Sequence, residues 1–251
     1  MKSHCIVDAA AHWKSVIMGL VVALTCQSAF AVPLLVNGGF DDGANGWSGA
    51  SSDTDAGGWT LIQVGDPSPS SNFPTSTIGN QMGTIAIADQ IPSPTTGGFQ
   101  PATVALYQPF HVPDLTQSVV LSFDMYVNDW AGQAAFTPAQ LGRVDIIESD
   151  APIFDTSAGV VFNAYIGTDG GPLPAPSVHR EFELAPLVEA GQDYIVRFYV
   201  NSQLFWQNMG VDNVEIEAVV PEPNFSPAAL MMCWAGVMAV CSRRSVRHNT
   251  R

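Results

Sequence analysis

Apolar and polar residues alternate along two long stretches of the chain. Between residues 119 and 128 every second residue is large and apolar: Val119, Leu121, Phe123, Met125 and Val127. Between residues 194 and 200 the same period recurs: Tyr194, Val196, Phe198 and Val200. A period of two over this length predicts a β-strand with one buried and one exposed face.

Seven shorter stretches have the same strand character. They are bounded by Gly, Pro, Asn and Asp residues, and they comprise Thr60–Val64, Thr84–Ala88, Leu106–Val112, Arg143–Ile147, Val160–Ile166, Arg180–Leu184 and Val211–Glu217. Many short strands divided by turn residues predict an all-β fold, an antiparallel β-sandwich. Within this domain only Pro186–Ala190 has helical character, for about one turn.

A second kind of apolar pattern marks the end of the chain. The uncharged run Phe225–Cys241 follows Pro221-Glu222-Pro223 and precedes four arginines: Arg243, Arg244, Arg247 and Arg251. At about 1.5 Å per residue, this run would span roughly 26 Å as a helix, enough to cross a bilayer core. The arginines place the tail in the cytoplasm and the preceding domain outside. We therefore predict a single C-terminal transmembrane helix.

The N-terminus has the features of a secretory signal peptide. Lys2 and Lys14 precede the apolar run Val16–Leu24, and Ala29-Phe30-Ala31 follows as an A-x-A cleavage site. Cys26 would carry the lipid of a lipoprotein, but the residues before it match that signal poorly. The predicted organisation is a signal peptide over 1–31, one β-sandwich domain over 32–218 and a C-terminal signal over 219–251.

Composition narrows the chemistry of the domain. All four cysteines lie outside residues 32–218, so the sequence predicts a domain without disulfides, thiol nucleophile or thiolate metal site. The chain carries a net charge of −14, and between residues 32 and 222 its only basic residues are Arg143, Arg180 and Arg197. Such a surface repels nucleic acid and anionic lipid. It suits divalent cations and neutral ligands, although solubility alone also explains it.

The C-terminal segment Val219–Arg251 resembles the PEP-CTERM sorting signal. Pro221-Glu222-Pro223, the apolar run and the basic tail occur in the order typical of that signal. The resemblance implies recognition by an exosortase, a membrane protease, and export through the inner membrane to the cell surface or extracellular matrix. The alternative is a plain membrane anchor with a chance Pro-Glu-Pro.

The two ends of the domain resemble galactose-binding-like jelly rolls, the fold of many carbohydrate-binding modules. The opening Asn37-Gly38-Gly39-Phe40-Asp41 is followed by Gly46-Trp47, and Gly210–Ile216 resembles the last strand of that fold. The resemblance implies a jelly roll with Trp47 in the core. It also implies structural calcium where the two ends meet, with Asp41 and Asp212 as ligands. Alternatively, Asp41 caps a turn and Asp212 faces water.

Catalytic patterns are weak in this domain. His111 and His179 are its only histidines, and neither is accompanied by G-x-S-x-G or H-E-x-x-H. Many carboxylates could in principle form a glycosidase pair, but no pattern singles out two of them. We therefore expect a protein that is not an enzyme.

An aromatic platform for sugar is the best candidate site. Trp130 follows a predicted strand, and Trp206 lies just before the last one. Flat aromatic faces bind the C–H surfaces of sugars, and amides and carboxylates bind their hydroxyls. The expected polar partners are Asn128, Asp129, Gln207 and Asn208. Alternatively, both tryptophans cap the core.

Together these patterns predict an exported polysaccharide-binding protein without catalytic activity, with exopolysaccharide as a candidate ligand. A structural surface protein without a small ligand and a polysaccharide-modifying enzyme are the alternatives.

Overall fold

All regular structure that the computed structural model describes is β. The described residues are 29–53, 57–63, 66, 84–90, 101–129, 139–167, 175–203 and 207–222. They contain no helix, and so none long and apolar enough to cross a membrane. Ala31–Val220 form one compact unit. Residues 1–28 of the predicted signal peptide, the predicted membrane helix and Pro223 lie outside the described residues.

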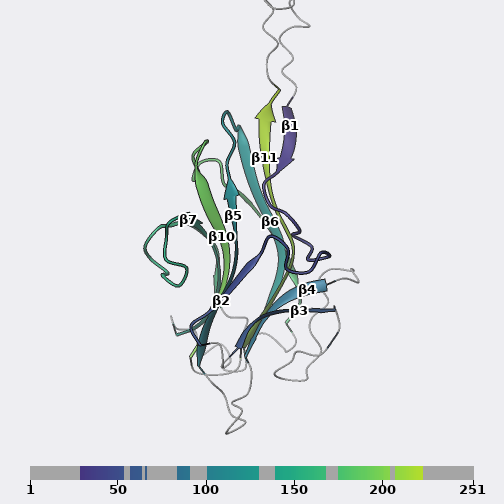
Figure 1. Cartoon of the computed structure of the whole chain (residues 1–251), viewed down its shortest axis with the longest axis vertical. Helices are drawn as coiled ribbons and strands as arrows, with labels where there is room; N and C mark the ends of the chain where they lie inside the picture. Colours follow the sequence, from purple (N-terminus) through teal and green to yellow (C-terminus); the bar gives the residue numbers. More distant parts are fainter. Residues whose placement is uncertain are drawn as a thin grey trace, which may run out of the picture. The chain divides into compact units, whose positions relative to one another are not determined.

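The strands form two sheets (Figure 1). Sheet A has the order β3 (Gly57–Gln63), β4 (Thr84–Gln90), β11 (Gln207–Pro221), β6 (Ser118–Asp129) and β9 (Val178–Glu183), with β1 (Ala29–Pro33) also paired to β11. Sheet B has the order β2 (Ser48–Ser51), β5 (Ala102–His111), β10 (Asp193–Ser202), β7 (Gln140–Glu148) and β8 (Val160–Gly167). Neighbouring strands along both orders are antiparallel. The prediction of an all-β fold with antiparallel sheets is confirmed for the described residues.

All nine predicted strands are present, and two further strands were not predicted. Strand β2 consists of small residues without apolar alternation, and it exists because it pairs with residues Val104 to Tyr107 of β5. In β1 only Val32 is even half-buried. The segment Pro186–Ala190, which was predicted to be helical, forms a hydrogen-bonded turn instead of a helix. In this turn Val188 N–H donates to Leu184 O at 3.1 Å.

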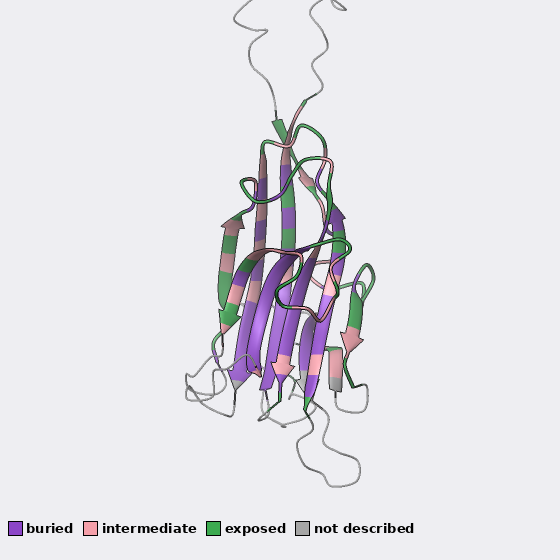
Figure 2. Ribbon diagram, turned by 90° about the vertical axis from the view of Figure 1, so that its left-hand side faces the viewer, coloured by how far each residue is buried: buried purple, intermediate pink, exposed green. Residues whose placement is uncertain are grey.

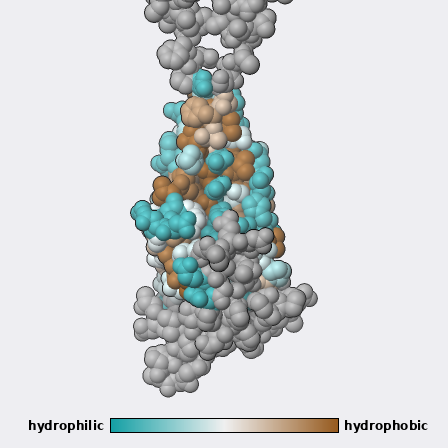
Figure 3. Space-filling model, turned by 90° about the vertical axis from the view of Figure 1, so that its right-hand side faces the viewer, coloured by the Kyte–Doolittle hydropathy of each residue, from teal (hydrophilic) through white to brown (hydrophobic). Residues whose placement is uncertain are grey.

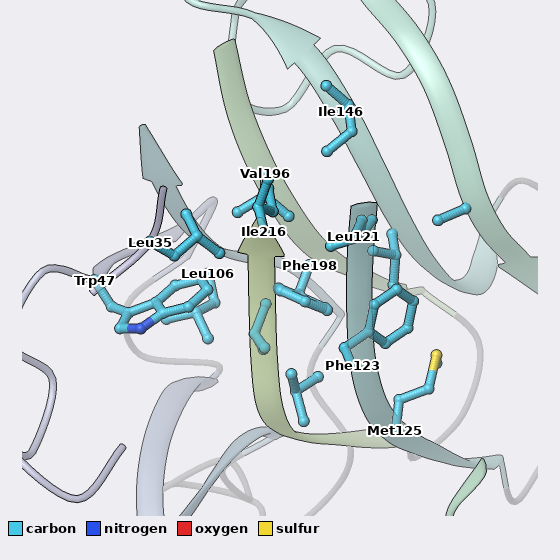
Figure 4. Packing of buried hydrophobic residues seen from close by; sticks show 14 of the residues in the cluster. Leu35, Trp47, Leu106, Leu121, Phe123, Met125, Ile146, Val196, Phe198 and Ile216 are labelled. Carbon is cyan, nitrogen blue, oxygen red and sulfur yellow. The ribbon is translucent and has the colours of Figure 1, made fainter. Parts of the chain in front are cut away.

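The hydrophobic core lies between the two sheets and uses the predicted alternation. Phe123 of β6 and Phe198 of β10 have 0% exposure, and their rings meet edge to face at 5.5 Å. Figure 4 shows these two residues packed near Leu121 and Ile216. The inner strands are buried along most of their length, whereas the outer strands carry exposed positions (Figure 2). Burial of apolar surface on this scale is the main stabilising contribution to such a fold.

The predicted half-buried character of β6 is lost at its C-terminal end. Tyr126 and Asn128 belong to the face expected to meet solvent, yet they are 2% and 3% exposed. Tyr126 packs with Ile85 and Ile87 of β4 and with Ala175, which forms a small second apolar cluster on the outer face of sheet A. The residues that cover a strand are distant in sequence, so alternation alone cannot predict this burial.

The residues of the opening motif, from Asn37 to Trp47, form the loop before β2 and hold it together by hydrogen bonds. Asn37 donates from Nδ2 to the carbonyls of Gly43 and Asn45, and its own carbonyl accepts from Trp47 Nε1 at 3.0 Å. Trp47 is 7% exposed and lies in the core, as predicted. Gly38 is required because a Cβ there would lie 1.8 Å from the carbonyl oxygen of Val214.

Candidate functional site

The polar residues predicted to flank the tryptophans are brought together by strand pairing. Strands β6 and β11 place Asn128 opposite Asn208 and Asp129 opposite Gln207, although nearly eighty residues separate them in sequence. Trp130 and Trp206 are the next residues along the chain, but both lie outside the described residues. The aromatic platform therefore stays a prediction.

The amides at this position are buried. Asn128, Gln207 and Asn208 are at most 3% exposed. Asn128 donates from Nδ2 to Asn208 Oδ1 at 2.8 Å, and its Oδ1 accepts from the backbone N–H of Ala175 at 2.7 Å. The side chain of Asn128 therefore links β6 to β11 and also binds Ala175, in the segment that leads into β9. Binding of sugar by these amides stays a prediction.

The structure gathers carboxylates around Asp212. This residue pairs with Asp124 across β11 and β6 and is 3% exposed. Burial is the main cause that raises the Asp212 pKa from 3.8 to about 6, and the negative charges of Asp124 and Asp41 raise it further. The N–H of Asn213, which donates to Asp212 Oδ1 at 2.8 Å, acts in the opposite direction. Like charges held this close favour binding of a proton or a cation.

Few carboxylate oxygens near Asp212 are free to bind calcium. Asp124 accepts from His179 Nδ1 with one oxygen and from Asn213 Nδ2 with the other, each at 2.8 Å. The described residues contain no group of three or more His, Cys, Asp or Glu side chains arranged to hold a metal. Calcium usually needs six to eight oxygen ligands, so here backbone carbonyls and water would have to complete the shell around Asp41 and Asp212. The calcium site stays a proposal.

A hollow of about 250 Å³ opens where the outer strands of the two sheets meet. We call it the edge hollow, and it is lined by Met125, Tyr126, Val127, Tyr165, Pro176, Val178 and Arg180. Tyr165 comes from β8 of sheet B, and Arg180 comes from β9 of sheet A. Asn128 helps to build it, because its bond to Ala175 fixes the residue before Pro176.

The walls of the edge hollow are aromatic and apolar, with one cationic group. The Arg180 guanidinium carbon lies 4.8 Å from the centre of the Tyr165 ring, within range of a cation–π interaction. Aromatic and apolar side chains together with fixed polar groups are typical of small-molecule sites. Figure 3 shows one face of the molecule, on which polar and apolar residues are interspersed over the described part.

Sequence reasoning missed Tyr165 and Arg180. A usable signal was present for Arg180, because it is one of only three cations between residues 32 and 222. No comparable signal marks Tyr165. The two residues meet only through the order of strands in the sheets, which the local pattern does not contain.

Both histidines of the domain pair with carboxylates. His111 Nδ1 lies 2.8 Å from Asp193, and His179 Nδ1 lies 2.8 Å from Asp124. Both imidazoles are more than half exposed. Within the described ranges no serine or threonine hydroxyl hydrogen bonds to either ring, so these pairs do not form a Ser-His-Asp arrangement there.

The predicted sorting motif begins at the end of β11. Pro221 is the last residue of that strand, and Glu222 after it is exposed. Proline cannot donate a backbone hydrogen bond, which accounts for the end of pairing here. Glu222 is therefore accessible to another protein.

Comparisons with known proteins give distant similarities only. No family model and no curated protein matches the sequence. Among solved structures, the carbohydrate-binding module TmCBM61 in complex with beta-1,4-galactotriose is 13% identical, with a TM-score of 0.42 over 74% of this chain and 97% of that chain. The K3 cleaved adhesin domain of Lys-gingipain from Porphyromonas gingivalis W83 is 16% identical, with a TM-score of 0.46 over 75% and 99%.

Enzymes are also among the similar structures. The enzymatically active domain of tailspike protein 4 from bacteriophage CBA120 is 14% identical, with a TM-score of 0.43 over 74% of this chain. The present chain spans only 21% of that tailspike chain. Similarity at this level does not show any function for the present chain.

Proposed function

We propose that this protein is an exported polysaccharide-binding protein without catalytic activity, and that the edge hollow accepts one sugar ring. The observation that carries the proposal is the pairing of a tyrosine and an arginine at the edge hollow. The C–H faces of a sugar pack against aromatic and apolar walls, and its oxygen atoms need a few fixed donors. Tyr165 supplies an aromatic wall and Arg180 supplies the donors.

The size of the hollow agrees with a single ring. Pockets for drug-sized ligands typically enclose about 300–1,000 Å³, whereas the edge hollow encloses about 250 Å³. A polymer would therefore place one unit in the hollow and run along the neighbouring surface. The predicted tryptophan platform would offer a second contact to such a polymer.

Export and sorting complete the proposal. The predicted signal peptide would direct the chain through the inner membrane, and an exosortase would recognise Pro221-Glu222-Pro223. Cleavage after Ala31 would remove three residues of β1, all of which are exposed, so the core would be untouched. The resulting location, at the cell surface or in the matrix, is where a polysaccharide partner occurs.

Binding of soluble polysaccharides to the full chain tests the proposal. We expect saturable binding to at least one polymer, and we expect Tyr165→Ala to weaken it about tenfold or more, as loss of an aromatic contact does. Tyr107→Ala is the matched control, because Tyr107 is also half-buried but lies on β5. Equal losses in both variants, or sugar release from the polymer, would contradict the proposal.

A further inference from the structure

Arg180 occupies an inward-facing position on an edge strand. Along β9 the alternate residues Val178, Arg180 and Phe182 face the other sheet, and Phe182 packs against the core. Its ring stacks on Phe123 with the centroids 6.1 Å apart. The next inward position towards the start of the strand is thus a cation rather than an apolar residue.

The guanidinium of Arg180 has no hydrogen-bond acceptor among the described residues. Its side chain makes no ion pair or hydrogen bond with any described residue, and Nε is buried without an acceptor. The contact with Tyr165 is its one described interaction. A guanidinium carries five N–H donors, and a buried donor without an acceptor costs free energy.

The other two arginines of the domain show the contrast. Arg143 and Arg197 both donate to the carboxylate of Asp145, which is 0% exposed. Two of the three guanidinium groups of the domain therefore share one internal carboxylate. Arg180, the third, adjoins a hollow with room for a ligand.

We propose that the edge hollow selects an acidic sugar, a pyranose ring that carries a carboxylate, and that Arg180 binds this carboxylate. The inference rests on the proposed function and names the class of sugar. A planar guanidinium matches a carboxylate with two parallel hydrogen bonds, which are stronger than bonds between neutral groups. The ring would pack against Tyr165 and the apolar walls.

The charge of the whole protein makes this selectivity easy to recognise. The net charge is −14, so long-range forces oppose an acidic polymer. At physiological ionic strength these forces are screened beyond about 8 Å. A preference for an acidic polymer would therefore report a short-range contact rather than general attraction.

A different role of Arg180 makes the opposite prediction. Inward-pointing charges on edge strands prevent one sheet from pairing with another molecule. If that is the only role of Arg180, removal of the charge leads to self-association and leaves sugar binding unchanged.

Two matched polymers test the inference: a polyuronate, and the same polymer with its carboxylates chemically reduced to alcohols. The full chain, in a detergent without a sugar headgroup, is titrated with each. We expect the polyuronate to bind at least about tenfold more tightly than the reduced polymer. This is the size of effect expected when one charge-assisted hydrogen bond is lost. We expect Arg180→Met to bind both polymers equally. Arg180→Lys should keep part of the preference, since a lysine keeps the charge without the planar fork.

Glu181→Gln is the control, because Glu181 is exposed on the opposite face of the same strand, and it should keep the full preference. Melting temperatures and size-exclusion profiles show that each variant is folded and whether it self-associates. Equal binding of both polymers by the wild-type chain overturns the inference but leaves the proposed function intact. No binding of either polymer overturns the inference, whereas the proposed function is contradicted only if no polysaccharide binds. A preference that persists in Arg180→Met, for instance through calcium bridges, also overturns the inference.

Discussion

Arg197 donates a hydrogen bond from Nη2 to Oδ2 of Asp145, and both side chains are 0% exposed. Arg143 donates to the same carboxylate from Nε and Nη2, each at 3.1 Å. Arg197 also donates from Nη1 to the backbone carbonyls of Ile153 and Asp155. The ion triad thereby fixes the loop between β7 and β8 to sheet B.

Loss of the central carboxylate should destabilise the domain strongly. We expect Asp145→Ala to lower the free energy of unfolding by about 3–5 kcal/mol, because two buried guanidinium groups would lose their counter-charge. Urea denaturation measures this change. Asp150→Ala removes an exposed acid of the adjacent loop and should change stability by less than about 0.5 kcal/mol. A similar small change for Asp145→Ala would contradict the role assigned to the triad.

Asp212 should make the domain less stable as the pH rises. Its carboxyl releases its proton near pH 3.8 in the unfolded chain but at about pH 6 in the folded protein. Between these values the folded state holds a proton that the unfolded state has lost, so the free energy of unfolding falls until the pH exceeds about 6. From the size of the shift we expect a loss of about 1–3 kcal/mol.

Asp212→Asn isolates this contribution. The variant should be more stable than the wild type at pH 7 without calcium, and the two should converge near pH 4. Thermal melts between pH 4 and pH 8 in EDTA measure the difference. Parallel pH profiles for wild type and variant would mean that Asp212 does not titrate as described.

Calcium should reverse the effect of Asp212. A cation between Asp41 and Asp212 would relieve their repulsion, and calcium at a hundred times its dissociation constant would add about 2.7 kcal/mol to stability. We expect millimolar calcium to raise the melting temperature of the wild type and not that of Asp212→Asn. Identical wild-type melts in EDTA and calcium, with no calcium found by elemental analysis, would rule the site out.

The period-two pattern predicted nine strands because alternation is a local property of the sequence. Strand β2 was missed because Ser48–Ser51 carry no large apolar residue, and their pairing with β5 is a tertiary contact. The burial of Asn128 was missed for a similar reason. Ala175, whose N–H donates to Asn128, lies 47 residues away in sequence.

Some residues of the candidate sites could likewise be predicted from the sequence, whereas others could not. The sequence marks Asp212 and Asp41 through motifs at the two ends of the domain, but Asp124 appears only as an ordinary polar position in an alternating strand. Register places Asp124 opposite Asp212. Tyr165 and Arg180 belong to edge strands of different sheets, so only the complete topology brings them together.

The predicted tryptophan platform has its own test. If Trp130 or Trp206 stacks on sugar, changing it to Ala should cost about 1–3 kcal/mol of binding and little stability. Titration with a bound polysaccharide and thermal melts measure the two effects. Trp47→Ala is the control for a core position, because Trp47 is 7% exposed and should lose stability instead. A large drop in melting temperature with unchanged binding would place Trp130 or Trp206 in the core.

The most direct test is a titration of the full chain, in a detergent without a sugar headgroup, against a panel of neutral and acidic polysaccharides, with reducing ends assayed in the same samples. We expect saturable binding to at least one polymer, weaker binding by Tyr165→Ala but not by Tyr107→Ala, and no release of sugar. Absence of binding to every polymer by the folded chain, or release of sugar from a bound polymer, would contradict the proposed function.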